Sequence, residues 1–214
     1  MDNGSRNFDQ DAQRWDLNPG RVKAASEISR AILREIPLTP DMEVLDFGCG
    51  TGLLTLALQP YVRSVTGVDS SRGMLEVLRK KISDQGLTNA TARYLHIDGG
   101  DVLAGSYHLV ASSMTLHHVK DIASLLKQFY DVLQPSGLLA VADLDSEGGL
   151  FHSNNSGVFH FGFDREEMRE QCLRAGFRDI RLVQAAQIEK PVAGGATKIF
   201  TVFLIIGRRG NNEQ

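Results

Sequence analysis

Residues 44–52 have the sequence VLDFGCGTG, and this stretch decides the fold of the chain. Its first four residues are largely apolar and predict a short buried strand. Three alternating glycines then predict a tight turn, and the apolar run at 53–58 predicts the start of a helix. A glycine turn between a strand and a helix leaves backbone N–H groups free at the helix start, so a ligand can approach closely.

The glycines follow the spacing G-x-G-x-G at Gly48, Gly50 and Gly52. The dinucleotide fingerprint is G-x-G-x-x-G, and its third glycine would fall at Leu53. Taken alone, the spacing fits both a nucleotide-binding loop and a tight turn without a ligand. The rest of the chain has to decide between them.

Composition indicates one large α/β domain. The chain has 214 residues, 42% of them hydrophobic and 23% charged, which suffices for a substantial core. No apolar run approaches the roughly 18–20 residues of a membrane span. Residues 1–6 lack the apolar core of a signal peptide, and two cysteines make no disulfide framework. We therefore expect a cytoplasmic protein without a membrane span.

The net charge of −3 and the isoelectric point near 6.1 give no electrostatic reason to expect a nucleic-acid partner. Enzymes that modify amino groups of nucleic acids usually carry an Asn/Asp-Pro-Pro-aromatic run, whereas residues 112–115 have the sequence SSMT. We expect no nucleic acid as partner.

The N-terminal part divides into two segments. Residues 1–17 are polar and predicted to be loosely held, with Trp15 as a packing anchor or a lid over a pocket. Asn18 and Pro19 predict the start of a helix, whose apolar spacing continues to Ile36. We predict an N-terminal segment and covering helix at 1–36 and the main domain at 37–214, together one compact domain.

Five apolar strands alternate with helices, at residues 44–47, 64–68, 92–97, 107–111 and 138–142. Continuous apolar strands joined by helices predict a parallel sheet covered on both faces, and right-handed crossovers make it doubly wound. Residues 177–186 and 198–207 predict two further strands that pair antiparallel, since no helix joins them. We predict an α/β fold: a doubly wound, Rossmann-like, seven-stranded, mostly parallel sheet with a C-terminal antiparallel strand pair.

Polar side chains gather at one edge of this predicted sheet, because the carboxyl ends of parallel strands lie together. They are Asp46, Asp69, Asp98, Ser112 and Asp143. At the end of the second strand, Asp69 can accept hydrogen bonds from two ribose hydroxyls. Asp98 can accept from an exocyclic amine such as that of adenine. Each of these two could instead be a helix N-cap, and Asp46 could fix the loop or meet an ammonium group.

These residues together resemble the class I S-adenosylmethionine-dependent methyltransferases, nearest the small-molecule branch of ubiquinone and menaquinone biosynthesis. The similarity lies in VLDFGCGTG at 44–52, GVDSS at 67–71, LHHV at 116–119 and VLQPSG at 132–137. It covers roughly residues 40–207, including the C-terminal strand pair that nicotinamide-binding domains usually lack. The resemblance implies S-adenosylmethionine as cofactor and S-adenosylhomocysteine as product.

The resemblance also implies roles for individual residues. The glycines would face the methionine part of the cofactor, Asp69 would hold the ribose, and Ser113 would lie near the sulfonium. The implied cofactor-binding set is Asp46, Gly48, Gly50, Gly52, Asp69, Ser70, Met74, Asp98 and Ser113, with Ser70 and Met74 flanking the adenine.

Three positions depart from the family pattern. The usual Pro-Glu after the ribose aspartate's serine is Arg72-Gly73, and the usual aspartate early in the fourth strand is His108. The loop from Asp98 to residue 107 is short, so Asp101 could share or take over the adenine role.

The sulfonium is already a strong electrophile, so the protein mainly aligns acceptor and methyl group. A general base is needed only where the acceptor loses a proton. Candidates are His117, His118, His152, His160 and Asp143, and we single out His118 and His160. His117 and His118 could instead bond backbone at a strand end. His152 and His160 lack a third ligand, so we predict no metal.

We predict methyl transfer from S-adenosylmethionine to a small organic acceptor, by in-line displacement. The alternatives are a nicotinamide-dependent oxidoreductase and a non-catalytic protein that binds S-adenosylmethionine. The sequence leaves the acceptor, the methylated element and the oligomeric state open.

Overall fold

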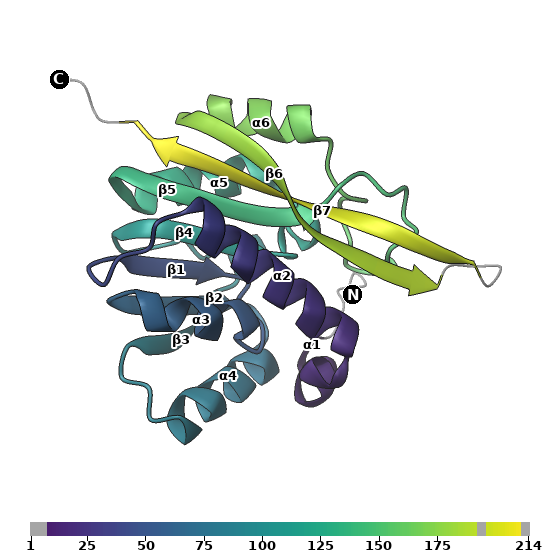
Figure 1. Cartoon of the computed structure of the whole chain (residues 1–214), viewed down its shortest axis with the longest axis horizontal. Helices are drawn as coiled ribbons and strands as arrows, with labels where there is room; N and C mark the ends of the chain where they lie inside the picture. The colour runs from purple at the N-terminus through teal and green to yellow at the C-terminus, as the bar shows by residue number, and fades with distance from the viewer. Residues whose placement is uncertain (1–7, 192–195, 211–214) are drawn as a thin grey trace.

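All seven predicted strands pair in one sheet, in the order β3-β2-β1-β4-β5-β7-β6 (Figure 1). The computed structural model describes residues 8–191 and 196–210. The strands are β1 (Glu43–Phe47), β2 (Ser64–Asp69), β3 (Ala90–Tyr94), β4 (Tyr107–Ser113), β5 (Leu133–Leu144), β6 (Phe177–Pro191) and β7 (Thr197–Arg209). The first five are parallel, and β7 lies antiparallel between β5 and β6. The predicted fold class is confirmed.

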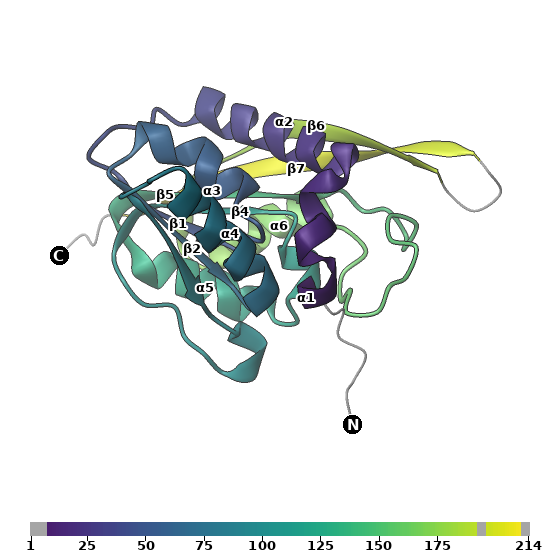
Figure 2. The same cartoon turned by 90° about the horizontal axis from the view of Figure 1, so that it is seen from below.

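Helices cover both faces of the sheet. They are α1 (Phe8–Asp11), α2 (Pro19–Glu35), α3 (Leu53–Leu58), α4 (Arg72–Asp84), α5 (Ile122–Val132) and α6 (Arg165–Arg174). Four short 3-10 turns join them: η1 (Ala12–Leu17), η2 (Gln59–Tyr61), η3 (Ile97–Gly99) and η4 (Leu116–His118). Figure 2 shows α2, α3 and α4 on one face and α5 on the other. In the described residues, no helix is long and apolar enough to cross a membrane.

Side-chain caps begin the four longest described helices, and the cap at Asn18 is the one that the sequence analysis predicts. The cap residues are Asn18 for α2, Ser71 for α4, Asp121 for α5 and Asp164 for α6. Each accepts a hydrogen bond from a backbone N–H of the first helical turn, which satisfies a donor that the helix itself leaves unpaired.

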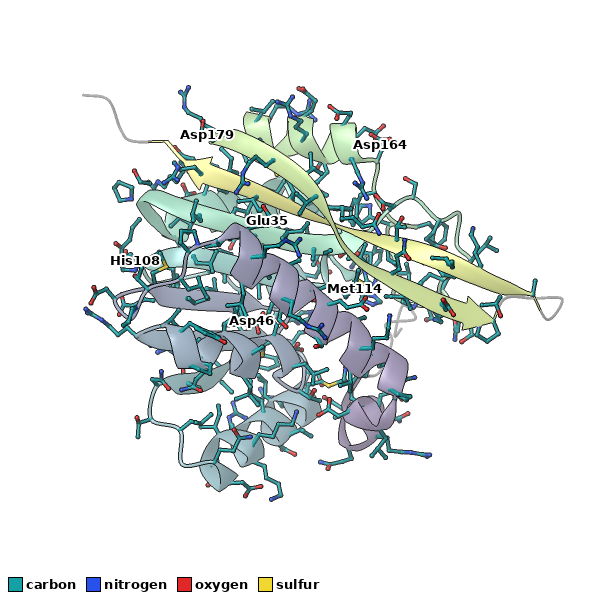
Figure 3. All side chains as sticks on the ribbon, viewed as in Figure 1. Glu35, Asp46, His108, Met114, Asp164 and Asp179 are labelled. Atoms are coloured by element: carbon teal, nitrogen blue, oxygen red, sulfur yellow. The ribbon has the colours of Figure 1, made fainter. Side chains whose placement is uncertain are left out.

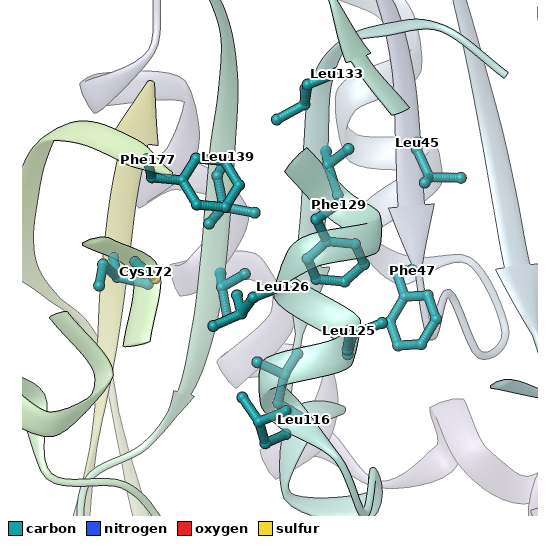
Figure 4. Packing of buried hydrophobic residues seen from close by; sticks show 14 of the residues in the cluster. Leu45, Phe47, Leu116, Leu125, Leu126, Phe129, Leu133, Leu139, Cys172 and Phe177 are labelled. Atoms are coloured by element: carbon teal, nitrogen blue, oxygen red, sulfur yellow. The ribbon is translucent and has the colours of Figure 1, made fainter. Parts of the chain in front are cut away.

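Two apolar clusters lie on opposite faces of the sheet. One joins α5 and α6 to the sheet, and in it Phe47 and Phe129 meet edge to face with ring centroids 5.2 Å apart (Figure 4). The other joins α2 and α3 to the same strands, with Ile28 and Ile32 fully buried. The central strands are therefore buried on both sides, which explains why they are continuously apolar.

Several strand boundaries differ from the prediction, and β6 ends at Pro191 rather than at residue 186. Strand β3 ends at Tyr94, not at residue 97, because Leu95 and Ile97 pack against the core from the following loop. Asp98 therefore lies in the η3 turn and not at a strand end. Strand β5 begins at Leu133, five residues early, and bends at Ser136, whose φ is 63°.

The expectation that residues 1–17 are loosely held is wrong for residues 8–17. These residues form α1 and η1 and lie against α4 and the glycine loop (Figures 1 and 2). Residues 1–7, together with Gly194 and Gly195 of the predicted β6–β7 connection, lie outside the described residues.

Candidate cofactor and acceptor site

The turn after β1 needs glycine at three positions. Gly48, Gly50 and Gly52 have φ values of 70°, 52° and 87°, in the left-handed region that favours glycine. A Cβ atom at Gly48 would lie 2.1 Å from the side chain of Thr115, whereas at Gly50 it would meet nothing within 4 Å. Gly48 thus allows close packing, while Gly50 leaves an open face on the loop.

Asp69 links the end of β2 to this glycine loop. Its Oδ2 accepts a hydrogen bond from the backbone N–H of Gly50 at 2.8 Å, and its Oδ1 accepts one from the N–H of Ser71 at 2.8 Å. The Asp69 carboxyl is half-buried, and burial raises its pKa, although these hydrogen bonds act in the opposite direction. Because each carboxylate oxygen has a further lone pair, Asp69 can still accept two ribose hydroxyls. The N-cap of α4 is Ser71, not Asp69.

Asp46 lies in β1, two residues before the first glycine of the loop (Figure 3). Its side chain is 1% exposed, and its Oδ2 accepts a hydrogen bond from the hydroxyl of Thr55 in α3 at 2.6 Å. Burial raises the pKa of Asp46 to about 7. This contact ties the first helix after the loop to β1.

The predicted adenine-side residues differ in exposure. Met74 is buried in the first turn of α4, whereas Ser70 and Asp98 are exposed. The Oδ2 of Asp101 accepts a hydrogen bond from the N–H of His96 at 2.8 Å, so Asp101 closes its own loop.

The N-terminal segment reaches the site through two aspartates that the sequence analysis missed. Asp9 Oδ1 accepts hydrogen bonds from the Ser71 hydroxyl at 2.5 Å and from the N–H of Gly73 at 2.8 Å. Asp16 accepts from the hydroxyl of Thr51 at 2.6 Å, in the glycine loop. These partners are far apart in the sequence, so no local pattern identifies them.

This docking explains one departure from the family pattern. A Cβ atom at Gly73 would lie 3.0 Å from the Cα and the carbonyl oxygen of Asp9. A glutamate at position 73 would push α1 away from α4. A second departure, His108, has a local role, because its Nδ1 accepts a hydrogen bond from the N–H of Glu43 at 3.1 Å.

The turn after β4 lies beside the glycine loop. Strand β4 ends at the half-buried Ser113, and Met114 then takes a left-handed conformation with φ of 56° (Figure 3). The hydroxyl of Thr115 is 3.3 Å from the carbonyl oxygen of Gly48. This contact joins the start of η4 to the glycine loop.

His117 in η4 pairs with Asp143 of β5, and both side chains are buried. The two atoms His117 Nδ1 and Asp143 Oδ1 are 2.6 Å apart. Burial alone would raise the pKa of Asp143, but the charge and hydrogen bonds of His117 hold this pKa below its usual value. The pair brings together two residues that the sequence analysis considered separately.

Two of the other three candidate bases, His118 and His152, lie next to this pair. His118 Nδ1 is 2.6 Å from the carbonyl oxygen of Gly157. The ring of His152 lies 5.1 Å from that of His117 and 5.5 Å from that of His118, between ring centroids. Phe8 of α1 packs edge-on against His118, with ring centroids 5.0 Å apart.

His160 lies apart from these three histidines. Its Nε2 is 2.9 Å from the carbonyl oxygen of Val119, and it lines a cavity of about 380 Å³ with Lys120 and Glu167. Cys49 is buried against Leu75 and Leu78, and burial raises the pKa of its thiol. Cys49 therefore packs against α4.

A family described as "Methyltransferase domain" matches residues 21–182 of the chain, which include the glycine loop, Asp69 and η4. The chain belongs to this methyltransferase family. The sequence-based assignment to the class I S-adenosylmethionine-dependent methyltransferases, with that cofactor, is confirmed. The family match also favours a methyltransferase over a nicotinamide-dependent oxidoreductase.

Individual methyltransferases are similar over parts of their length. An uncharacterized methyltransferase of Schizosaccharomyces pombe is 34% identical over 135 residues, 56% of this chain and 48% of that protein. Trans-aconitate 2-methyltransferase of Deinococcus radiodurans is 37% identical over 122 residues, 55% of this chain and 44% of that protein. The chain spans about half or less of the length of the curated relatives it matches.

The fold also matches solved methyltransferases. Phosphoethanolamine N-methyltransferase 2 of Haemonchus contortus, in complex with S-adenosyl-L-methionine, aligns with a TM-score of 0.70 at 16% identity. The alignment covers 97% of this chain and 61% of that one. At this identity the likeness is one of fold.

Proposed function

We propose that this protein transfers the methyl group of S-adenosylmethionine to a small organic acceptor in the cytoplasm. The observation that carries the proposal is the docking of residues 8–17 across the carboxyl edge of the sheet. Asp16 bonds the glycine loop, Asp9 bonds the start of α4, and Phe8 packs on His118. A segment that crosses the edge in this way would cover a bound acceptor and screen it from water.

The cofactor residues of the proposal fit the local geometry. The open face of Gly50 would receive the methionine end, and the spare lone pairs of Asp69 would accept the ribose hydroxyls. Ser70 and Met74 would flank the adenine, with Asp98 near its amine and Ser113 near the sulfonium. When bound, the cofactor supplies an activated methyl group for direct displacement.

The acceptor would bind next to η4, because Thr115 places this turn beside the glycine loop. His118 reaches this region from η4, and His160 is held nearby through Val119. The protein's own contribution is then to hold acceptor and methyl group in line and to exclude water. The relative named trans-aconitate 2-methyltransferase and the phosphoethanolamine N-methyltransferase structure support a small acceptor.

Calorimetry and a turnover assay test the proposal. We expect S-adenosylhomocysteine to bind in the micromolar range or tighter, and NADH not to bind. Turnover should appear with a panel of small carboxylic acids, amines, phenols and thiols, and not with transfer RNA. No binding of S-adenosylhomocysteine at millimolar concentration would contradict the proposal. Turnover with transfer RNA alone would overturn the small acceptor, and binding without turnover on any acceptor would favour the non-catalytic alternative.

A further inference from the structure

Three histidines from two distant segments meet beside the proposed acceptor position. His117 and His118 come from η4, and His152 comes from the loop after β5. One ligand nitrogen from each ring can be chosen so that all three lie within 4.8 Å of one another. Neutral imidazole nitrogens are the commonest protein ligands for Zn²⁺.

A hydrogen bond fixes which nitrogen of His118 holds the lone pair. Its Nδ1 faces the carbonyl oxygen of Gly157 at 2.6 Å, and a carbonyl can only accept. His118 Nδ1 must therefore donate, so in the neutral ring Nε2 holds the lone pair.

His117 is arranged in the same way. Its Nδ1 faces Asp143 Oδ1 at 2.6 Å, and Asp143 also accepts from the backbone N–H groups of His117 and Leu144. A carboxylate with three donors around it acts as an acceptor, so His117 Nδ1 carries the proton. Metal-binding histidines in proteins almost always donate their second ring N–H to a carboxylate or a backbone carbonyl. Both adjacent histidines show this arrangement.

The third histidine is carried by an anchored loop. Glu147, itself buried, accepts hydrogen bonds from the backbone N–H groups of Leu150 and, at 2.6 Å, Phe151. Phe151 packs edge-on against Phe200 of β7, with ring centroids 5.2 Å apart. These contacts hold the residue before His152 in place, so the ring of His152 is brought to η4 by the fold.

We propose that His117, His118 and His152 form a binding site for a divalent transition-metal ion of the Zn²⁺ class. With Zn–N bonds of about 2.0–2.1 Å, tetrahedral ligands lie about 3.3 Å apart, so the rings need to close by at most about 1.5 Å. Three protein ligands leave a fourth position for water or for a donor atom of another molecule. Sequence reasoning considered His152 with His160 and predicted no metal; the fold instead groups His152 with the η4 histidines.

The role of the fourth metal position rests on the proposed function, because it depends on where the acceptor binds. If the acceptor binds beside η4, the fourth position would suit an acceptor with a hydroxyl, carboxylate or thiol group. Metal binding itself does not depend on this, because it needs only the three rings and Asp143.

Zinc binding to the untagged full chain tests the site. After stripping with a chelator, the protein is dialysed against Zn²⁺ and its metal content is measured. We expect one Zn²⁺ per chain, lost in His118→Gln and in His152→Gln. His160→Gln is the matched control, since its histidine lies in the same loop outside the cluster, and it should retain Zn²⁺. No zinc in the wild type, or equal zinc in all variants, would overturn the proposal.

Asp143→Asn gives a second readout that a merely structural role would not produce. Loss of a carboxylate partner lowers metal affinity about 10–100-fold, so Zn²⁺ should bind correspondingly more weakly. Titration with Co²⁺ should likewise show weaker binding in Asp143→Asn than in the wild type. The visible spectrum of bound Co²⁺ should change in His152→Gln. Unchanged metal affinity in Asp143→Asn, with the fold intact by circular dichroism, contradicts the site.

Binding of S-adenosylhomocysteine to the same variants separates the two proposals. We expect its affinity to stay within error of the wild type in His152→Gln, because His152 is not among the proposed cofactor-binding residues. Failure of zinc binding with intact cofactor binding would then overturn only the metal site.

Discussion

At the scale of single residues, Asp69 ties the end of β2 to the glycine loop. Its place after an apolar strand and before a capped helix made it visible in the sequence. Its hydrogen bond from the N–H of Gly50, 19 residues away, could not be predicted. A local sequence pattern does not specify which loop lies next to the end of a strand. Asp69 therefore shapes the loop, and its further lone pairs are the ones that the proposed cofactor would use.

Asp69→Ala should weaken binding of S-adenosylhomocysteine by about 1.5–3 kcal/mol, because hydrogen bonds to a charged carboxylate are lost. Calorimetry measures the change, and thermal unfolding without ligand shows whether the fold survives. Asp41→Ala, at an exposed carboxylate, is the control. Unchanged affinity in a folded Asp69→Ala protein would leave Asp69 with a loop-holding role only.

Asp46 should make stability depend on pH. The folded protein keeps the proton on Asp46 up to a pH of about 7, its raised pKa, whereas an unfolded aspartate releases it near about 3.9. The folded state thus binds more protons between these values, and the wild type loses stability as pH rises through them. Asp46→Asn removes this loss. Its free energy of unfolding, relative to that of the wild type, should therefore increase by about 2–4 kcal/mol from pH 4 to pH 7.

Urea unfolding of both proteins across this pH range measures the difference in their free energies of unfolding. The contributions of the other titrating groups largely cancel in this difference. Asp41→Asn serves as the comparison at an exposed site. A difference between Asp46→Asn and the wild type that stays flat with pH would mean that Asp46 is ionised throughout.

At the scale of elements, the sequence was informative where a helix or strand follows its own periodicity. Helix α2 was predicted from its cap residue Asn18 and its apolar spacing. Strand β3 was misplaced because Leu95 and Ile97 are apolar for reasons of loop packing. Residues 8–17 were misjudged because their stability comes from Asp9 and Asp16, whose partners lie 35 to 65 residues away.

The docking of α1 on α4 should fail in Gly73→Ala. The added Cβ would lie 3.0 Å from the backbone of Asp9, so the N-terminal segment must move. Asp9→Ala should act in the same way by removing two hydrogen bonds, worth about 0.5–1.5 kcal/mol each. Trp15, the only tryptophan, lies in this segment, and its fluorescence should become more accessible to acrylamide in both variants.

Glu76→Ala, on the exposed side of α4, is the matched control and should leave the quenching of Trp15 unchanged. Gly73→Ala also gains about 1 kcal/mol of intrinsic helix preference. A stabilised protein with unchanged quenching would therefore indicate that α1 does not pack against Gly73.

For the whole molecule, the alternation of strands and helices was enough to predict the sheet and the edge where its polar residues meet. The grouping of histidines at that edge was not predictable, because His152 reaches η4 only through a loop anchored by Glu147. Strand-end positions follow from topology, while loop positions follow from tertiary contacts. This is why the sequence could place Asp46 and Asp69 at the sheet edge but could not place the histidine cluster there.

Because one sheet joins both apolar clusters, the chain should unfold in a single transition, and a ligand bound at the sheet edge should stabilise all of it. S-adenosylhomocysteine at about 100 times its dissociation constant should raise the free energy of unfolding by about 2.7 kcal/mol. At the same ligand concentration, an affinity loss of about 1.5–3 kcal/mol in Asp69→Ala reduces this gain to about 0.3–1.3 kcal/mol. Urea unfolding with and without ligand measures both gains, and NADH should produce neither. A gain in Asp69→Ala equal to that of the wild type would contradict the calorimetric prediction from an independent direction, since both measurements depend on the same binding constant.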